Sequence, residues 1–197
     1  MKLLLATRNP GKLLELWRML DGVAGLDVIG LADVPEYPEA PETGATFAEN
    51  ALAKARDAAE ATGVPSVADD SGLTVDALNG MPGVLSARWS GRHGDDLANV
   101  ELLLAQLGDV PDERRGAAFV CAAALVVPGG EETVVHGEWS GVIARAPRGS
   151  NGFGYDPIFV PDRETRTSAE LSVPEKDASS HRARALHALI PHLRALA

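Results

Sequence analysis

The order of apolar and amphipathic stretches along the chain constrains its fold more than any other feature. Residues 2–7 form a short apolar run, and residues 12–20 have the apolar spacing of a helix that is buried on one side. Later, residues 117–127, 133–139 and 142–146 have the composition of successive strands. Helices that alternate with strands early, followed by a run of strands, predict an α/β fold built on a mixed sheet.

Local signals predict where several elements begin and end. Thr46 and Glu49 have the spacing of a capping box, which predicts an alanine-rich helix that starts here and stops at Gly63. Residues 65–68 predict a short strand that ends at the pair Asp69-Asp70. The other expected elements are a strand at 26–31, an extended segment at 73–78, a helix at 95–107, a strand at 157–160 and a closing helix at 175–196 bent at Pro191.

Composition excludes several classes of protein. A chain of 197 residues suits one domain, which we expect to span residues 1–197 and to have two lobes. The formal net charge of −10 argues against a broad surface for nucleic acid or for an anionic membrane. The apolar runs are too short to span a bilayer, and no signal-peptide core is present, so we expect a cytoplasmic protein. Cys121 is the single cysteine, and its apolar neighbours predict a core position.

The turn between the first strand and the first helix has two interpretations. Asn followed by Pro is a preferred helix start, which makes the turn purely structural. The same geometry points free backbone N–H groups and the positive end of the helix at a ligand, and a lysine adds a full charge, which suits a phosphate. The turn consists of Thr7, Arg8, Asn9, Pro10, Gly11 and Lys12.

Asp69 and Asp70 come at the end of the expected strand at residues 65–68, where α/β proteins place ligands. Because side chains alternate along a strand, the two carboxylates should point in different directions. Both could be solvated turn residues, or one could cap the turn while the other faces a cleft. Beside a polyphosphate, one aspartate would be a natural Mg²⁺ ligand and activator of water.

Two further stretches could bring charge to such a site. Asn50 and Lys54 lie four residues apart, on one face of the expected alanine-rich helix. Glu39 and Glu42 precede this helix and could add a carboxylate to a metal, although acidic loops are usually just solvated.

The glycine-rich stretch at residues 149–157 offers an aromatic ring on a backbone that can approach a ligand closely. Phe153 could stack on a nucleobase, or Phe153 and Tyr155 could both fill the core. Near the start of the closing helix, Lys176, His181 and Arg182 supply several hydrogen-bond donors. Together these stretches favour nucleotide chemistry.

The motifs that carry a family resemblance follow one another along nearly the whole chain. They are Thr7-x-Asn9-x-x-Lys12, Glu42-Thr43-Gly44-x-Thr46-Phe47-x-Glu49-Asn50-Ala51-x-x-Lys54-Ala55, Ala68-Asp69-Asp70-Ser71-Gly72-Leu73, Gly152-Phe153-Gly154-Tyr155-Asp156-Pro157 and Ser180-His181-Arg182. In these motifs the chain resembles the inosine triphosphate pyrophosphatases, which clear non-standard purine nucleoside triphosphates.

The resemblance implies an elongated α/β fold of two lobes around a central mixed β-sheet with flanking helices. It places the active site in the cleft between the lobes and implies a homodimer. It also implies Mg²⁺-dependent hydrolysis of ITP, dITP and XTP to the monophosphate and pyrophosphate, which keeps these nucleotides out of DNA and RNA. The expected partner is thus a small nucleotide, with no nucleic acid and no membrane.

The resemblance also implies roles for individual residues. Asp70 would be the proton acceptor and a metal ligand, with Glu42 as the second metal carboxylate and Glu39 as the alternative. Thr7–Lys12 would bind the triphosphate, and Lys54 would face the phosphates. Phe153 would stack on the purine, with donors from Lys176, His181 or Arg182 on its 6-keto oxygen. The substrate-binding set is completed by Ser71, Gly154, Tyr155 and Asp156.

One position departs from the family pattern, and two alternative functions remain. Arg8 stands where a small residue such as glycine is common, and its side chain could contribute to phosphate binding. A related Maf-like pyrophosphatase would carry Ser-Pro-Arg in its opening motif, where this chain has Asn9-Pro10-Gly11-Lys12. A non-catalytic nucleotide-binding module would be marked by loss of the acid, but Asp70 is present.

Overall fold

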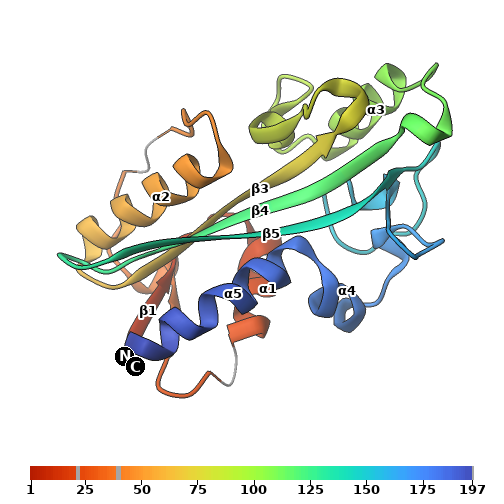
Figure 1. The fold of residues 1–197 in the computed structure, drawn as a ribbon. Helices are drawn as coiled ribbons and strands as arrows, with labels where there is room; N and C mark the ends of the chain where they lie inside the picture. The colour runs from red at the N-terminus through yellow and green to blue at the C-terminus, as the bar shows by residue number, and fades with distance from the viewer. Residues whose placement is uncertain (21–22, 39–40, 197) are drawn as a thin grey trace. The chain divides into compact units, whose positions relative to one another are not determined.

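The structure is a computed structural model that describes residues 1–20, 23–38 and 41–196 (Figure 1). A six-stranded sheet has the order β2-β1-β3-β4-β5-β6. β1 pairs in parallel with β2 and β3, whereas β5 and β6 are antiparallel, so the mixed sheet expected of an α/β fold is confirmed. The strands are β1 (Lys2–Leu5), β2 (Asp27–Gly30), β3 (Ser66–Val75), β4 (Gly116–Val126), β5 (Glu132–Ile143) and β6 (Phe159–Pro161).

The longer helices begin and end close to where the sequence predicts. The Thr46 side chain caps α2 by accepting a hydrogen bond from the Glu49 backbone N–H at 3.1 Å. The same helix ends at Gly63, whose φ of 68° is the left-handed conformation that glycine adopts without strain. The helices are α1 (Pro10–Leu20), α2 (Phe47–Thr62), α3 (Asp96–Gln106), α4 (Val173–Ser179) and α5 (His181–Leu196).

Two predicted strand ends are wrong, because glycine lets each strand continue. β3 runs unbroken through the acidic pair, where a turn was expected. A side chain on Gly72 would lie 2.6 Å from the carbonyl oxygen of Gly83, so only glycine fits in the strand there. β5 is likewise one strand where two were expected, since Gly141 lets the backbone of β6 approach closely.

The C-terminal helix is also divided at a different place from the one expected. Ser180 is extended, with φ −64° and ψ 161°, and separates α4 from α5. Pro191 lies inside α5 and does not end it. The break therefore comes immediately before His181 and Arg182, two of the candidate site residues.

The contacts of the described residues divide the chain into two compact units. Unit 1 comprises Met1–Asp70, Cys121–Gly137 and Arg182–Ala197. Unit 2 comprises Ser71–Val120 and Glu138–His181. The expectation of a single domain of two lobes with a cleft between them stays a prediction.

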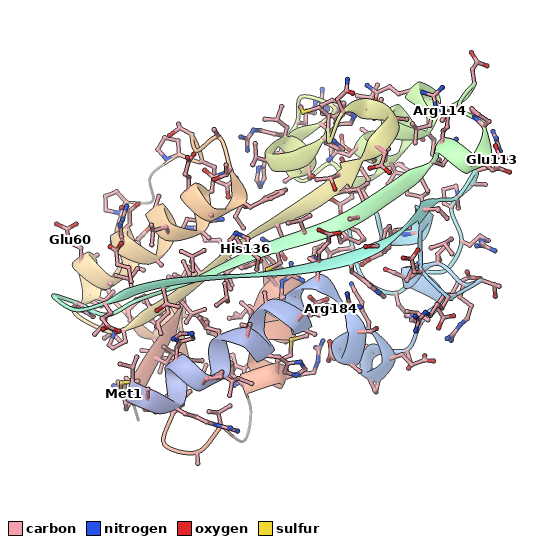
Figure 2. All side chains as sticks on the ribbon, viewed as in Figure 1. Met1, Glu60, Glu113, Arg114, His136 and Arg184 are labelled. Carbon is pink, nitrogen blue, oxygen red and sulfur yellow. The ribbon has the colours of Figure 1, made fainter. Side chains whose placement is uncertain are left out.

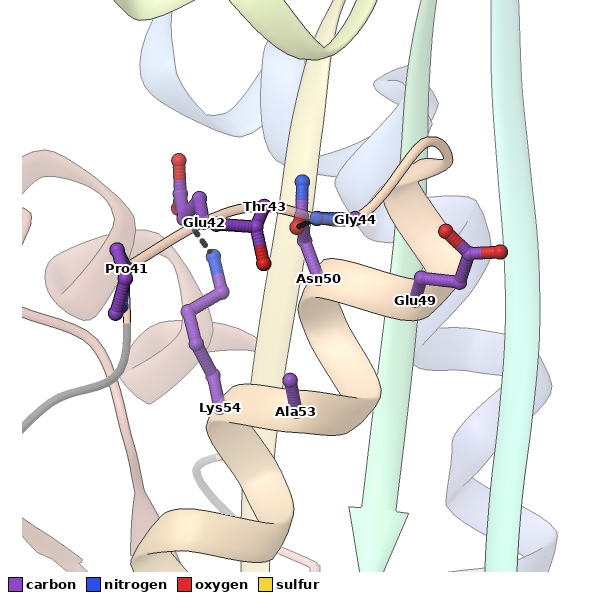
Figure 3. A pocket seen from close by; sticks show the side chains of 8 residues that line it. All are labelled: Pro41, Glu42, Thr43, Gly44, Glu49, Asn50, Ala53 and Lys54. Carbon is purple, nitrogen blue, oxygen red and sulfur yellow. Dashed lines mark hydrogen bonds and ion pairs between the residues drawn. The ribbon is translucent and has the colours of Figure 1, made fainter.

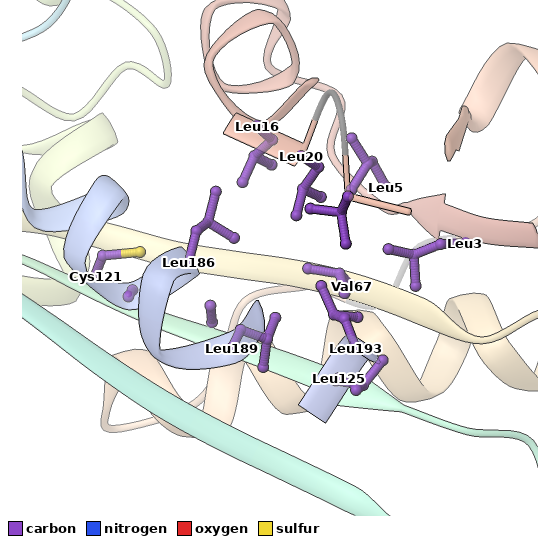
Figure 4. Packing of buried hydrophobic residues seen from close by; sticks show 13 residues of the cluster. Leu3, Leu5, Leu16, Leu20, Val67, Cys121, Leu125, Leu186, Leu189 and Leu193 are labelled. Atoms are coloured by element: carbon purple, nitrogen blue, oxygen red, sulfur yellow. The ribbon is translucent and has the colours of Figure 1, made fainter. Parts of the chain in front are cut away.

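Unit 1 covers both faces of its strands with helices. On one face, Leu3 and Leu5 of β1 pack in a single cluster with leucines of α1 and α5 (Figure 4). On the other face, Leu4 packs with the buried alanines of α2. Because alternate residues of a strand face opposite sides, this double cover explains why β1 is apolar at consecutive positions.

The small side chains of α2 let this helix lie close to the sheet. Ala51, Ala55 and Ala58 are fully buried in the same cluster as Ala122 and Ala124 of β4. Alanine also has the highest helix propensity, so the sequence that permits close packing also stabilises the helix. Because α2 packs closely on the sheet, Asn50 and Lys54 reach Asp70 of β3.

Unit 2 has an aromatic core. The ring centroid of Phe159 lies 4.6 Å from that of Phe119 and 5.5 Å from that of Trp139. Val100 and Leu103, the buried apolar residues of α3, belong to the same cluster. The core thus supports the glycine-rich stretch that ends at β6.

Two further expectations concern the single cysteine and membrane-spanning helices. Cys121 is fully buried in unit 1, as expected, and burial raises the pKa of its thiol to about 12. Within residues 1–20, 23–38 and 41–196, no helix has the length and apolar character needed to cross a membrane.

Replacing Leu189 with alanine tests the packing of α5. Leu189 is fully buried against the cluster on β1, so Leu189→Ala should lower the free energy of unfolding by about 3 kcal/mol. Leu14→Ala is the matched control, because that side chain is 61% exposed on α1. Urea denaturation of both variants measures the effect, and equal losses would contradict this packing.

Candidate active site

The acidic pair lies in the middle of β3, and the two carboxylates point to opposite faces of the sheet, as predicted. Asp69 contacts residues of α1 and α5, whereas Asp70 contacts residues of α2. Both aspartates are almost fully buried, with 2% and 6% of their surface exposed. The interpretation of the pair as solvated turn residues is therefore wrong.

Asp69 is the centre of a buried ionic cluster in unit 1. Its Oδ2 lies 3.0 Å from Nζ of Lys12 and 3.3 Å from Nε of Arg182. Arg182 also donates a hydrogen bond from its guanidinium to Glu15. Burial opposes ionisation of Asp69, but Lys12, Arg182 and Lys54 outweigh it and hold the pKa of the carboxyl below its usual 3.8.

Sequence reasoning missed this cluster in part. It named Lys12 and Arg182 as substrate ligands but gave no role to Glu15 and none of its own to Asp69. A signal was available, because Glu15 falls on the face of α1 that Leu16 and Leu20 bury. A carboxylate on a buried helix face indicates a charged partner. The partner, Arg182, lies 167 residues further along the chain.

The turn of residues 7–12 has the structural role that its sequence predicts. Asn9 starts α1, since its Oδ1 accepts the backbone N–H of Lys12 at 3.1 Å. Thr7 Oγ1 in turn accepts the backbone N–H of Asn9 at 3.3 Å. The side chains of Arg8 and Asn9 are exposed, and Arg8 donates to the Tyr37 carbonyl at 3.4 Å. Binding of a phosphate by this turn stays a prediction.

Asp70 is held by two residues of α2. Its Oδ2 accepts a hydrogen bond from Nδ2 of Asn50 at 3.0 Å, and its Oδ1 lies 3.3 Å from Nζ of Lys54. Burial raises the pKa of Asp70 above its usual 3.8, although Lys54, Lys12 and the Asn50 hydrogen bond act in the opposite direction. A carboxylate with a raised pKa is a better proton acceptor than an ordinary one.

Glu42 and Asp70 both pair with the ammonium group of Lys54. The Oε1 atom of Glu42 lies 2.8 Å from Nζ of Lys54. Figure 3 shows the side chains of Glu42 and Lys54 at the pocket that these two residues help to line. Burial lowers the pKa of Lys54, but the carboxylates of Asp70, Asp69 and Glu42 outweigh it and raise the pKa above 10.5. Lys54 is therefore charged at neutral pH.

The two carboxylates fit a divalent cation. Glu42 and Asp70 come from separate segments yet reach one positive charge, and carboxylate oxygens are the ligands that hard cations prefer. Among the described residues, no group of three or more His, Cys, Asp or Glu side chains could hold a metal by itself. A cation that also binds substrate phosphates needs only one or two carboxylates. The alternative ligand Glu39 lies outside the described residues.

Asp156 organises the glycine-rich loop in unit 2. Its Oδ2 accepts the backbone N–H of Phe153 at 2.9 Å and lies 2.6 Å from Nζ of Lys176. Its Oδ1 accepts a hydrogen bond from the Ser168 hydroxyl. Gly152 has φ 77° and leaves no room for a side chain beside Asp156. The loop is therefore fixed by a buried carboxylate.

The two aromatic residues of this loop have different surroundings. Tyr155 is 4% exposed in the core of unit 2, and its hydroxyl donates to the Ser86 carbonyl at 2.9 Å. Phe153 is half-buried, with Nζ of Lys176 5.2 Å from its ring centroid. Of the two rings, that of Phe153 is thus the more exposed, and its stacking on a base stays a prediction. Burial raises the pKa of Tyr155, so its hydroxyl stays protonated.

The remaining candidates in unit 2 are His181, Gly154 and Ser71. The His181 ring stacks on Phe119 with a centroid distance of 4.8 Å. Gly154 donates its backbone N–H to Asp96 at 2.8 Å, and Ser71 is half-buried on β3. Unit 1 thus holds Thr7–Lys12, Glu42, Lys54, Asp70 and Arg182, and unit 2 holds Ser71, Phe153, Gly154, Tyr155, Asp156, Lys176 and His181.

Comparison with known proteins finds similarity over nearly the whole chain. The model of the Ham1 family matches residues 3–192. A "dITP/XTP pyrophosphatase" of Nocardia farcinica is 70% identical over 198 residues, which cover all of this chain and 96% of the relative. A protein of the same name from Streptomyces coelicolor is 59% identical over 99% of this chain and 98% of the relative.

Two solved structures are also similar to this chain over nearly its whole length. The crystal structure of a "Nucleoside-triphosphatase / dITP/XTP pyrophosphatase" from Mycobacterium abscessus is 68% identical with a TM-score of 0.80, covering 98% of this chain and all of that one. The Ham1 protein of Staphylococcus aureus is 40% identical with a TM-score of 0.88, and the match covers both chains in full.

Replacing Arg182 with methionine tests the buried ionic cluster. Arg182→Met leaves Asp69 and Glu15 without their shared cation, so the free energy of unfolding should fall by about 3 to 5 kcal/mol. Arg184→Met on the exposed side of the same helix is the control and should change it by less than about 0.5 kcal/mol (Figure 2). Denaturation at pH 7 measures both, and a stable Arg182→Met variant would contradict the cluster.

Proposed function

The chain belongs to the Ham1 family, and on this premise we propose that it hydrolyses the non-standard purine nucleotides ITP, dITP and XTP to the monophosphate and pyrophosphate. The main support is the full-length similarity to relatives that are named dITP/XTP pyrophosphatases. The proposed cellular role is to keep these nucleotides out of DNA and RNA.

The turn of residues 7–12 would bind the triphosphate. It combines the positive N-terminal end of α1 with two nearby cations. Lys12 stands on the first turn of α1, and Arg8 is exposed beside it. Lys12 and Lys54 would offset the charge that develops on the phosphate oxygens during cleavage.

Glu42 and Asp70 would hold the divalent metal that the family requires, and we propose magnesium as this ion. When bound with a nucleotide, such an ion neutralises phosphate charge and makes a bound water more acidic. The support lies in the donor set, two carboxylates that share one ammonium group in unit 1.

Asp70 would act as the proton acceptor. Its burial raises its pKa, which favours taking a proton from the attacking water. The water oxygen then bonds to the α-phosphorus, the bond from this phosphorus to the bridging oxygen breaks, and pyrophosphate leaves. The proton of the water ends on the Asp70 carboxylate.

The candidate residues of unit 2, with Arg182, would bind the substrate, and several of them its base. Phe153 would stack on the purine, and a donor from Lys176, His181 or Arg182 would meet the 6-keto oxygen. Adenine has an amino group at that position and would leave the donor unpaired, which is costly in a buried site. The other residues proposed to contact substrate are Ser71, Gly154, Tyr155 and Asp156. A homodimer and a cytoplasmic location also stay predictions.

An assay of products across ITP, XTP, dITP, GTP and ATP tests the reaction. With Mg²⁺, the chain should release pyrophosphate and monophosphate from the first three, and ATP should react far more slowly because its amino group cannot accept the donor. Release of orthophosphate would contradict the cleavage site, and equal rates on ATP would contradict the base selection. Omission of the metal should abolish turnover.

Replacing Asp70 with asparagine tests the proton acceptor. Asp70→Asn keeps the shape of the side chain but removes its basicity and one metal ligand, so kcat should fall by at least about 100-fold. Asp109→Asn is the same chemical change at an exposed position and should turn over ITP normally. Near-normal kcat in Asp70→Asn would show that another group accepts the proton.

A further inference from the structure

We propose that Asn50 is a positioning residue that fixes Glu42 and Asp70 relative to each other as a metal-binding pair. This inference rests on the proposed function, because it concerns the same two carboxylates. Asn50 has no assigned role in substrate or metal binding, and it is 2% exposed in the first turn of α2.

The carboxamide of Asn50 links the two segments that carry these carboxylates. Its Nδ2 donates to Oδ2 of Asp70 on β3 at 3.0 Å. Its Oδ1 accepts the backbone N–H of Gly44 at 2.8 Å, and Gly44 lies two residues after Glu42. One buried side chain therefore joins the strand of the first carboxylate to the loop of the second.

The loop that carries Glu42 depends on α2 for its hydrogen bonds. Three successive backbone N–H groups of this loop, those of residues 44, 45 and 46, are accepted by side chains of Glu49 and Asn50. The bond from Ala45 to Glu49 is 2.6 Å long. The loop is thus fixed by residues of the helix that follows it.

The absence of a side chain at Gly44 allows the loop backbone to approach Asn50. A side chain at Gly44 would place its Cβ 2.6 Å from Oδ1 of Asn50, well inside van der Waals contact. Only a glycine lets the loop backbone approach the carboxamide to hydrogen-bond distance. The position of the loop relative to Asn50 is therefore narrowly defined.

Asn50 and Lys54 contact different oxygens of Asp70. The hydrogen bond from Asn50 occupies Oδ2, whereas Oδ1 lies beside Lys54, the residue that contacts Glu42. Lys54 is one turn further along α2, so a single helix holds both carboxylates from one face. The carboxamide has its donor and its acceptor on separate atoms, so Nδ2 can donate to the carboxylate while Oδ1 accepts the backbone N–H.

Binding of Mn²⁺ to the full chain without nucleotide tests this role. The concentration of free Mn²⁺ is measured by electron paramagnetic resonance, so the readout does not depend on turnover. Asn50→Ala should weaken Mn²⁺ binding by about tenfold, the usual effect of removing a residue that orients metal ligands. Glu60→Ala, at an exposed position of the same helix, should bind Mn²⁺ like the original chain (Figure 2).

A second variant keeps the test valid if Asn50→Ala does not fold. Gly44→Ala would place a Cβ 2.6 Å from Oδ1 of Asn50 and 2.8 Å from Cβ of Glu49, so it should displace the loop from Asn50 and also weaken Mn²⁺ binding. Melting curves without metal establish which variants fold. With ITP as substrate, excess Mg²⁺ should restore most of the turnover of the folded variants, whereas a general packing defect would not respond to metal.

The outcomes separate this inference from the proposed function. Asp70→Asn should lose Mn²⁺ binding and turnover together, and if it kept both, the proposed site would fail. If Asp70→Asn behaves as expected but folded Asn50→Ala and Gly44→Ala bind Mn²⁺ like the original chain, the role of Asn50 is overturned and the proposed function stands.

Discussion

The arrangement of unit 1 depends on two neighbouring carboxylates in the middle of a strand that is covered on both faces. Consecutive residues of a strand point in opposite directions, so Asp69 and Asp70 are removed from water on opposite sides of the sheet. A buried carboxylate without a partner is too costly to persist, and each side must therefore supply its own cations and donors. The helices that cover the two faces supply them, and in doing so they set the chemistry of the site.

The two aspartates have different pKa values because their surroundings differ. Asp69 lies against Lys12 and Arg182, and cations outweigh burial, so its pKa is lowered and it stays charged. Asp70 lies against Lys54 and the neutral carboxamide of Asn50, and burial prevails, so its pKa is raised. One aspartate is thereby suited to holding cations in place, and the other to accepting a proton.

Unit 2 uses a buried carboxylate in a related way. Asp156 accepts hydrogen bonds from the Phe153 backbone and the Ser168 hydroxyl, and it pairs with Lys176. The backbone of this loop also bonds to Ala169, whose carbonyl accepts the N–H groups of Ser150 and Asn151, so the charged acceptor adds to these bonds. The half-buried ring of Phe153 consequently sits on a backbone that Asp156 holds in place.

The sequence by itself determined the α/β class, the cap and the stop of α2, and the opposite directions of Asp69 and Asp70. These properties follow from local periodicity and from residue types that act over a few positions. The tertiary structure alone decided that β3 continues past the acidic pair, because Gly72 packs against residues more than ten positions away. It alone also joined Arg182 to Glu15 and Asn50 to Asp70. Such pairs form because of the way helices pack on a sheet. The energy of a buried charge depends on the groups that this packing brings beside it, and not on the residues next to it in the sequence.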